Sequence, residues 1–231
     1  MYRGGFGTFG YFLTPWIKRL VVANTLFFLL TWTGVIPFGF ALQAFGFSRS
    51  QILTEPWTVI TYMFVHAGFF HVFFNMLMLF FFGPPLEERW GGREFIKFYA
   101  ICGVGGAFFT FIFGGDTPIV GASGAVLGVL LAYALNWPDN LIWIWAIFPI
   151  KAKYLVLIIG AISFFSAFSP SSGGIAHFAH LGGLVVGYVY LKKGWAVQAR
   201  FEGMKRRFRM RKFSVVPGGK SDSLATGQRS R

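Results

Sequence analysis

A serine between small residues lies in the run from Gly121 to Gly124, where the sequence becomes strongly apolar. A serine hydroxyl is a weak nucleophile until a base removes its proton, and a neutral histidine can act as that base. The candidate base is His180, which lies in a second apolar stretch. Ser123 and His180 could therefore carry out acyl transfer if the fold brings their side chains together.

A second set of polar residues could stabilise the oxyanion of such a reaction. His71 and Asn75 are four residues apart, so they share one face of a helix, and His66 lies five residues before His71. His71, Asn75 and the backbone N–H of Ser123 could each donate a hydrogen bond to the oxyanion. Losing one such donor typically costs about 3 kcal/mol of transition-state stabilisation.

Each of these residues also has a structural interpretation, which remains the main alternative. A lone serine in an apolar helix usually bonds to a carbonyl of its own helix. A lone histidine or asparagine often links two helices. We interpret His177, one turn before His180, as a structural residue or a residue at the rim of the site.

The composition identifies the bilayer as the solvent of this chain. Of its 231 residues, 55% are hydrophobic and 13% are charged, too few polar side chains to cover a soluble globule. A membrane-spanning helix needs roughly 20 apolar residues. Stretches such as Phe73 to Phe82 are apolar on all sides, whereas barrel strands alternate in polarity. We expect an all-α, polytopic membrane protein.

Six helical spans are predicted, which places both termini on one side of the membrane. They cover residues 20–41, 59–82, 95–113, 120–136, 153–168 and 174–192. The chain then divides into an N-terminal segment (1–19), a membrane domain (20–192) and a basic tail (193–231). Of the 21 Lys and Arg, the loops of one face hold only Arg49, so the positive-inside rule places both termini in the cytoplasm.

This topology predicts that the polar residues converge. The second, fourth and sixth spans place His71, Ser123 and His180 near the same outer face. Small residues four apart allow close contact between helices. They lie at Gly124 and Gly128 in the fourth span and at Ala179, Gly183 and Gly187 in the sixth.

The charge and the cysteine content exclude other classes. The net charge of +13 and the basic run of residues 205–212 fit contact with an anionic leaflet rather than with nucleic acid. Residues 216–231 are predicted to be disordered. The single cysteine, Cys102, excludes an internal disulfide and is interpreted as a packing residue. The aromatic stretch at Trp143 and Trp145 is interpreted as an interfacial belt.

Neither zinc nor aspartyl chemistry fits, and we expect no metal or cofactor. His66 and His71 are not followed by glutamate, as a His-Glu-x-x-His zinc motif requires. Asp116 and Asp139 lie in predicted loops rather than in spans, where an aspartyl dyad would need them.

At residues 55–190 the sequence resembles the rhomboid intramembrane serine proteases. The family pattern of a histidine, a second histidine five residues on and an asparagine four further is matched by His66, His71 and Asn75. Its Gly-x-Ser-Gly motif is matched by Gly121, Ala122, Ser123 and Gly124, and its Ala-His motif with a later glycine by Ala179, His180 and Gly183.

The resemblance implies a Ser-His dyad without a third acid, in which Ser123 is the nucleophile and His180 the general base. It implies an oxyanion hole of His71, Asn75 and the Ser123 amide. It also implies a structural role for Glu87 after the second span. Substrates would be transmembrane helices cut near the outer face. Structural support is expected from His66, Gly121, Gly124, Gly183 and Gly187.

Two features of the resemblance concern how substrates approach. The fifth span, with Phe164, Phe165 and Phe168, would gate access of a substrate helix. Many members have Trp-Arg in the first outer loop, whereas this chain has Trp57-Thr58, a departure that concerns the ordering of that loop.

Two other functions stay open. A rhomboid-like protein could bind transmembrane clients without cutting them. A transporter could use the histidines as a proton relay, and it would then tolerate Ser123→Ala. We expect a prokaryotic plasma membrane as the location.

Overall fold

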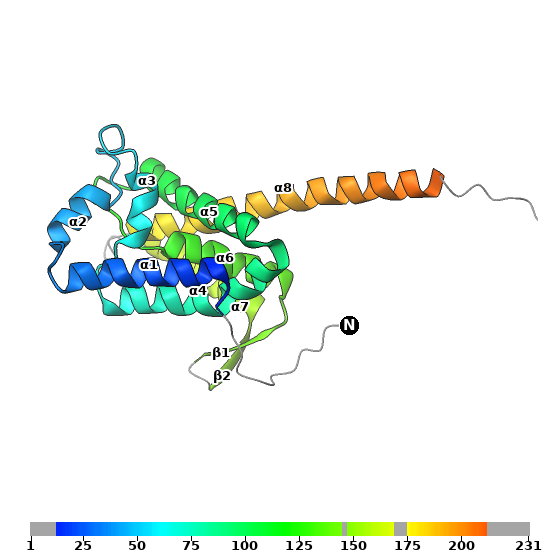
Figure 1. The fold of residues 1–231 in the computed structure, drawn as a ribbon, viewed down its shortest axis with the longest axis horizontal. Coiled ribbons are helices and arrows are strands. Elements are labelled where there is room, and N and C mark those ends of the chain that lie inside the picture. Colours follow the sequence, from blue (N-terminus) through cyan, green and yellow to red (C-terminus); the bar gives the residue numbers. More distant parts are fainter. Residues whose placement is uncertain (1–12, 145–146, 169–174, 212–231) are drawn as a thin grey trace, which may run out of the picture. The chain divides into compact units, whose positions relative to one another are not determined.

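The computed structural model describes residues 13–144, 147–168 and 175–211, without the side chains of residue 175 and of residues 195–211. Residues 216–231, predicted to be disordered, lie outside this part. Contacts divide the chain into two units, Met1–Lys192 and Lys193–Arg231. The described elements are α1 (Pro15–Trp32), α2 (Phe38–Phe45), α3 (Thr58–Thr61), the 3-10 helix η1 (Tyr62–Phe64), α4 (Phe69–Trp90), α5 (Gly92–Phe113), α6 (Ser123–Asn136), β1 (Leu141–Ile144), β2 (Phe148–Lys151), α7 (Ala152–Ala167) and α8 (Ile175–Arg211) (Figure 1).

Two helices of the described chain, α4 and α5, are long and apolar enough to cross a membrane. Each has 22 residues, whereas α6 has 14 and α7 has 16. Both shorter helices are apolar. The predicted count of six spans therefore stays a prediction, while the helical membrane fold agrees with the sequence.

Several predicted boundaries are wrong. The first helix ends at Trp32 rather than at residue 41, and a separate helix, α2, begins at Phe38 and runs past the predicted end. The second long helix begins at Phe69 rather than at residue 59, because Gly68 has an extended backbone. Residues before it form α3 and η1. The same helix continues beyond residue 82 through Pro84 and Pro85 to Trp90.

The all-α prediction needs one correction, a β-hairpin between α6 and α7. Strands β1 and β2 are antiparallel, with Trp143 opposite Pro149 and Leu141 opposite Lys151. Isoleucines in both strands favour an extended backbone over a helix. Trp143 is half exposed, and its place in an aromatic belt stays a prediction, while Trp145 lies outside the described residues.

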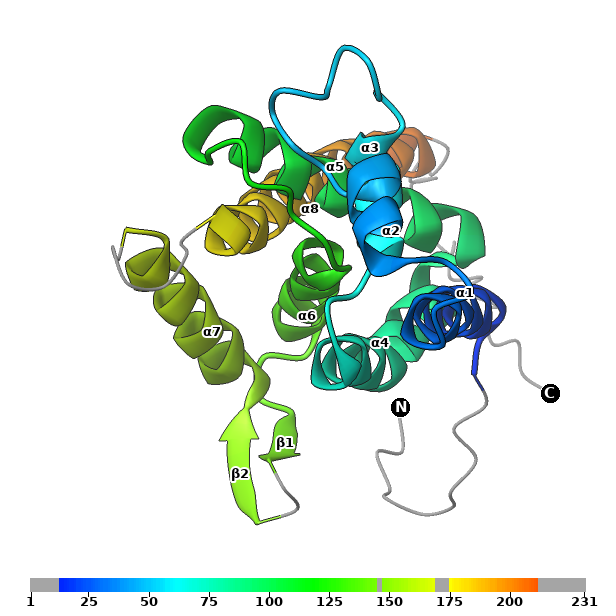
Figure 2. The same cartoon turned by 90° about the vertical axis from the view of Figure 1, so that its left-hand side faces the viewer.

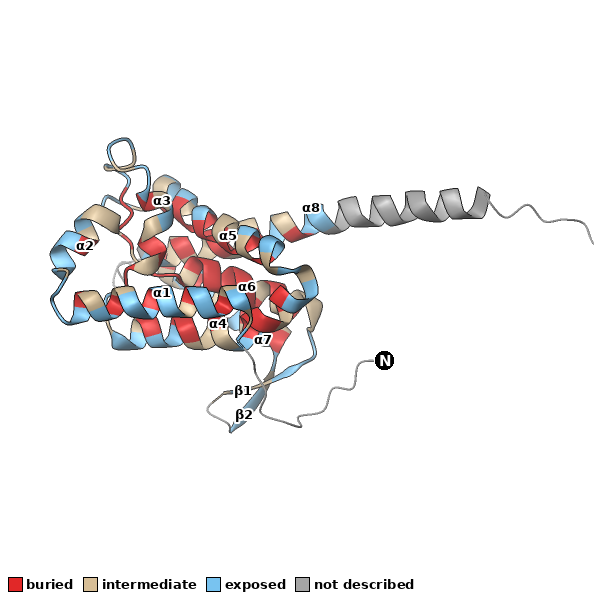
Figure 3. Ribbon diagram, viewed as in Figure 1, coloured by how far each residue is buried: buried red, intermediate tan, exposed pale blue. Residues whose placement is uncertain are grey.

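Helix α6 forms the centre of the bundle (Figure 2). It packs against α4, α5 and α7, and nine of its 14 residues are buried. A helix that is apolar on all sides is typical of a protein core or of a membrane span, and α6 is enclosed by other helices. Buried positions gather on α6 and on the faces of its neighbours, while the outer faces of α1 and α4 carry many exposed positions (Figure 3).

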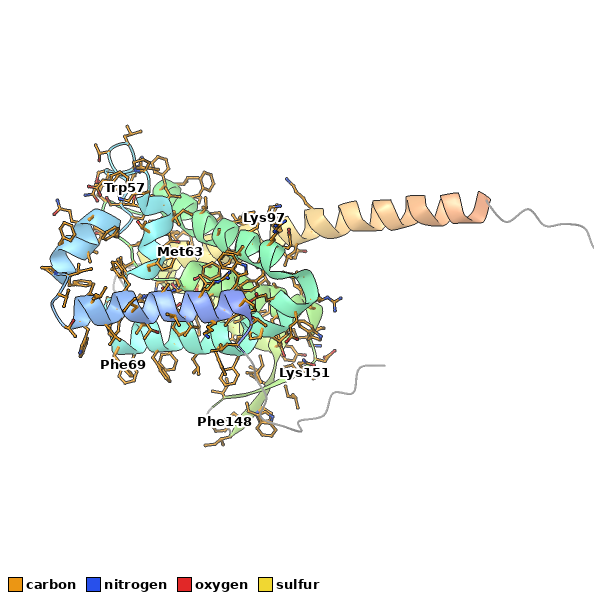
Figure 4. The ribbon with its side chains drawn as sticks, in the orientation of Figure 1. Trp57, Met63, Phe69, Lys97, Phe148 and Lys151 are labelled. Carbon is orange, nitrogen blue, oxygen red and sulfur yellow. The ribbon has the colours of Figure 1, made fainter. Side chains whose placement is uncertain are left out.

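The two ends of the bundle differ in character. Helices α4, α6 and α8 begin at the same end (Figures 1 and 2). Trp57 and Phe69 lie toward that end, whereas Lys97 and Lys151 lie toward the other (Figure 4). This arrangement places the N-terminus of α6, and with it Ser123, at the end poor in basic residues.

Candidate active site

Ser123 and His180 are in direct contact. The Oγ atom of Ser123 lies 2.7 Å from the Nε2 atom of His180, within hydrogen-bond distance. Ser123 is the first residue of α6, and His180 lies near the start of α8. The two residues are 57 positions apart in the chain, so the contact depends on how these helices pack.

The packing of α6 on α8 depends on glycines. A Cβ atom added to Gly183 would lie 1.9 Å from the carbonyl oxygen of Gly124. One added to Gly124 would lie 2.8 Å from the carbonyl oxygen of Ala179. Neither position has room for a larger side chain, so the two backbones touch beside the dyad.

Buried Cys102 fills the space beside the next glycines along these helices. A Cβ atom on Gly128 would lie 2.4 Å from its Sγ atom, and one on Gly187 would lie 3.0 Å from it. Cys102 is fully buried and free, so its interpretation as a packing residue is confirmed.

The loop before α6 places His71 next to the candidate nucleophile, Ser123. Gly121 has a φ of 110°, a conformation that favours glycine. A Cβ atom there would lie 2.4 Å from the Nε2 atom of His71, so the imidazole ring lies against the residue two positions before Ser123. The N–H of Gly121 donates to the carbonyl oxygen of Tyr62 at 2.9 Å, which fixes this loop.

Asn75 is buried one turn further along α4. Its Nδ2 donates to the carbonyl oxygen of His71 at 2.8 Å, a bond within its own helix. An asparagine amide has two N–H groups, so one remains for another acceptor. The structure thus brings His71 to the loop of the nucleophile and holds Asn75 by its own backbone.

His66 is buried just before α4 and supports His71. The two rings lie 4.9 Å apart, edge to face, with an interplanar angle of 67°. His177 has a similar relationship to His180, with ring centroids 5.6 Å apart at an angle of 88°. His177 therefore lies beside the base, as the sequence predicted for a structural or rim residue.

The sequence analysis missed one polar residue of this site, Ser163 on α7. Its Oγ lies 3.5 Å from the Nδ1 atom of His180. The sequence holds only a weak signal for it, a polar group within an apolar helix, which is costly without a partner. That signal does not identify the partner.

Glu87 lies near the C-terminal end of α4, where it holds the start of α1. Its carboxylate accepts from the backbone N–H of Trp16 at 3.0 Å, from that of Ile17 at 3.2 Å and from the hydroxyl of Thr14. A carboxylate at a helix N-terminus satisfies free N–H groups and interacts favourably with the helix dipole. Glu87 thus joins α4 to α1, away from the dyad.

The departure at Trp57-Thr58 leaves the segment between α1 and α4 well connected. The indole N–H of Trp57 donates to the carbonyl oxygen of Ala44 at 2.8 Å. The hydroxyl of Thr58, which is buried, donates to the carbonyl oxygen of Glu55 at 2.6 Å. The first bond joins the start of α3 to the end of α2. The second closes the turn that precedes α3.

Comparison with known proteins shows the family of the chain. Residues 53–196 match the Rhomboid domain. The chain belongs to the rhomboid family. This rhomboid is 36% identical over 138 residues to RHOMBOID-like protein 1 of Arabidopsis thaliana, covering 58% of the chain and 33% of that relative. It is 32% identical over 168 residues to Rhomboid protease GluP of Bacillus subtilis, covering 71% of the chain and 31% of the relative.

A third relative is Rhomboid protein 1, mitochondrial, of Saccharomyces cerevisiae, which is 28% identical over 176 residues, 72% of the chain and 49% of the relative. The rhomboid chain described here spans about a third to a half of the length of these relatives. Its family and its apolar helices identify an integral membrane protein. The relatives come from a plant, a yeast and a bacterium, so the prokaryotic location stays a prediction.

Proposed function

We propose that this rhomboid is an intramembrane serine endopeptidase that cleaves transmembrane segments of other membrane proteins near the outer face of the bilayer. The observation that supports the proposal best is the 2.7 Å separation of Ser123 Oγ and His180 Nε2. A nucleophile within hydrogen-bond distance of its base is the arrangement that covalent catalysis requires.

In the proposed reaction, His180 Nε2 takes the hydroxyl proton of Ser123 as Oγ attacks the carbonyl carbon of the scissile peptide bond. The tetrahedral intermediate collapses when His180 returns that proton to the departing amine, leaving an acyl-enzyme. His180 then takes a proton from a water molecule, whose oxygen attacks the ester carbon. The second tetrahedral intermediate collapses when His180 gives this proton to the departing Oγ of Ser123, which releases the new carboxyl end and restores the hydroxyl.

The oxyanion of each intermediate needs donors, and three groups near Ser123 are candidates. The backbone N–H of Ser123 lies in the first turn of α6, where amides lack partners within the helix and the helix dipole is positive. His71 lies against Gly121, on the same loop. Asn75 keeps the second N–H of its amide.

In the membrane, α1, α4, α5, α6, α7 and the first part of α8 would form six spans. Among the Lys and Arg residues, only Arg49 lies in the segments that would be outside, residues 33–68, 114–122 and 168–174. The positive-inside rule then places both termini in the cytoplasm. The basic tail would contact anionic lipid rather than nucleic acid. A prokaryotic plasma membrane remains the proposed location.

Substrates would approach along α7, whose outer end carries three exposed aromatic side chains, Phe164, Phe165 and Phe168. A peptide bond inside a substrate helix is shielded by the hydrogen bonds of that helix. Transmembrane segments with proline or glycine near the outer face should therefore be cut best, because these residues weaken a helix.

The test is cleavage of a panel of single-span proteins in detergent by wild type, Ser123→Ala and His180→Ala. Cleavage by wild type alone, with all three proteins folded, would support the dyad. If folded wild type cuts no substrate, a client-binding rhomboid-like protein becomes the better explanation. If Ser123→Ala still cuts, the assignment of the nucleophile is wrong, and cleavage after His180→Ala would remove the base from the mechanism.

A further inference from the structure

We propose that Ser163 positions His180, by accepting a hydrogen bond from the Nδ1–H of its imidazole ring. This inference rests on the proposed function, since it assigns a role in the same reaction. Ser163 would make no contact with the substrate or with the reacting atoms. It would act through the orientation and protonation of the base.

The placement of Ser163 favours a role inside the protein. Its side chain is 2% exposed, whereas its neighbours Ile162 and Phe164 are 58% and 50% exposed. The buried residues of α7 are Ala152, Val156, Ser163 and Ala167, spaced as one helix face. Ser163 is the polar residue of this face, and it lies opposite His180.

The chemistry of the dyad determines which way the hydrogen bond runs. A neutral imidazole has one N–H, so one ring nitrogen donates and the other accepts. To take the proton of Ser123, the Nε2 atom of His180 must be the acceptor. The ring proton then resides on Nδ1, where an oxygen acceptor holds that tautomer. The Oγ of Ser163, 3.5 Å away, is placed to be this acceptor.

The same contact persists when the base is protonated. After proton transfer both ring nitrogens are donors, and the bond from Nδ1–H to Ser163 Oγ becomes charge-assisted. Such bonds are stronger where water is excluded. A separation of 3.5 Å is long for a hydrogen bond, but catalytic contacts often shorten when substrate binds.

A serine on a helix has another common role, a bond to a carbonyl of its own helix. The two roles predict different results for Ser163→Ala. A positioning residue affects the chemical step, so kcat should fall about 10- to 100-fold, as for a hydrogen bond to a charged group, with KM unchanged. A structural residue affects folding, so the unfolding temperature should fall while the remaining folded protein keeps its kcat.

The experiment uses the full chain, purified in detergent, and a substrate that wild type cleaves. The variants are Ser163→Ala, Ser163→Thr, which keeps the hydroxyl, and Thr31→Val as a matched control. Thr31 is a buried hydroxyl on α1 that donates to the carbonyl oxygen of Phe28 at 2.9 Å. For each protein kcat, KM and the unfolding temperature are measured.

The expected result is a lower kcat for Ser163→Ala at unchanged KM and unfolding temperature, with most of the loss recovered in Ser163→Thr and wild-type kcat in Thr31→Val. A wild-type kcat for Ser163→Ala would overturn the proposal. A loss that only follows the unfolding temperature would overturn it too. If the Ser163→Thr variant does not fold, the kcat of Ser163→Ala alone tests the proposal. A different result, the absence of cleavage by folded wild type, would contradict the proposed function itself.

Discussion

Gly183 of α8 and Gly124 of α6 touch through their backbones, since a Cβ atom on the first would lie 1.9 Å from the carbonyl oxygen of the second. One residue before Gly124 is Ser123, and three before Gly183 is His180. The backbone contact therefore determines how far apart the hydroxyl and the imidazole lie. The distance between these two side chains therefore depends on the separation of α6 and α8 more than on side-chain flexibility.

Gly183→Ala should destabilise the protein by about 2 kcal/mol or more and abolish cleavage, because the new methyl group meets backbone that cannot move aside. Gly160→Ala on α7 is the matched control, since its Cβ would meet Leu184 at an ordinary 3.6 Å. There alanine should be neutral or gain up to about 1 kcal/mol through its helix propensity. Thermal unfolding in detergent measures both. Equal stability of the two variants would contradict the close contact.

Gly121→Ala should reduce cleavage strongly while the bundle stays folded. The added Cβ would lie 2.4 Å from the Nε2 atom of His71, and the φ of 110° is unfavourable for alanine. The control is Gly34→Ala, which has a φ of 78° but nothing within 4 Å of its added Cβ. The Gly34→Ala variant therefore has a strained backbone, but its new methyl group displaces no histidine. Reaction of Ser123 with a fluorophosphonate should therefore slow in the first variant and not in the second.

Glu87→Gln should lower the free energy of unfolding by about 2 kcal/mol, as expected when the charged acceptor of buried hydrogen bonds is replaced. The amide would turn an N–H toward the donors at the start of α1. Molecules that remain folded should keep their specific activity, because Glu87 lies away from the dyad. Glu88→Gln, at an exposed neighbouring position, is the control and should change neither quantity. A similar loss in both variants would speak against a specific contact.

Asp139 should stabilise the β-hairpin in a manner that depends on pH. Its carboxylate accepts from Lys153 Nζ at 2.8 Å and from Lys151 Nζ at 3.1 Å, and these bonds hold its pKa below the ordinary value of 3.8. Because the folded state favours the charged form, the stabilisation is complete above the ordinary pKa and disappears as the pH falls through the lower folded value.

The measurement is the difference in unfolding temperature between wild type and Asp139→Asn. It should be small at neutral pH, since the groups are exposed, and should shrink further in high salt. At a pH below both pKa values it should vanish. A difference that is independent of pH would show that the ion pairs contribute nothing.

The sequence predicted the partners of the dyad because their placement depends on topology and on small residues. Once Ser123 and His180 were assigned to the outer ends of two spans, glycines at four-residue spacing indicated contact between these spans. The structure agrees, with Gly124 and Gly183 in backbone contact.

Helix boundaries were harder to predict. An unbroken apolar composition from residue 59 onward predicted one helix, but Gly68 adopts an extended conformation and separates η1 from α4. Conversely, Pro84 and Pro85 lie within α4 and do not end it. The helix continues to Glu87, which binds the start of α1. Apolar composition therefore predicts that a segment enters the membrane but not where its helix begins or ends.

Ser163 could not be assigned from the sequence for a different reason. A serine in an apolar helix usually bonds within that helix, and hydropathy does not indicate which side of α7 faces α6. Apolar residues lie on both the exposed and the buried faces of α7, so the pattern gives no rotation about its axis. Only packing shows that Ser163 lies inward and Phe165 outward.

The 16 residues of α7 make it a short membrane helix, about 24 Å long against a hydrocarbon core of about 30 Å. Much of its surface is exposed, so in a bilayer of that thickness the lipid around α7 would have to thin to match this short helix. Because Ser163 lies on this helix, such thinning would act on the element that carries the contact with His180. If His180 is the base of the proposed reaction, we expect the rate of cleavage to depend on the acyl-chain length of the surrounding lipid.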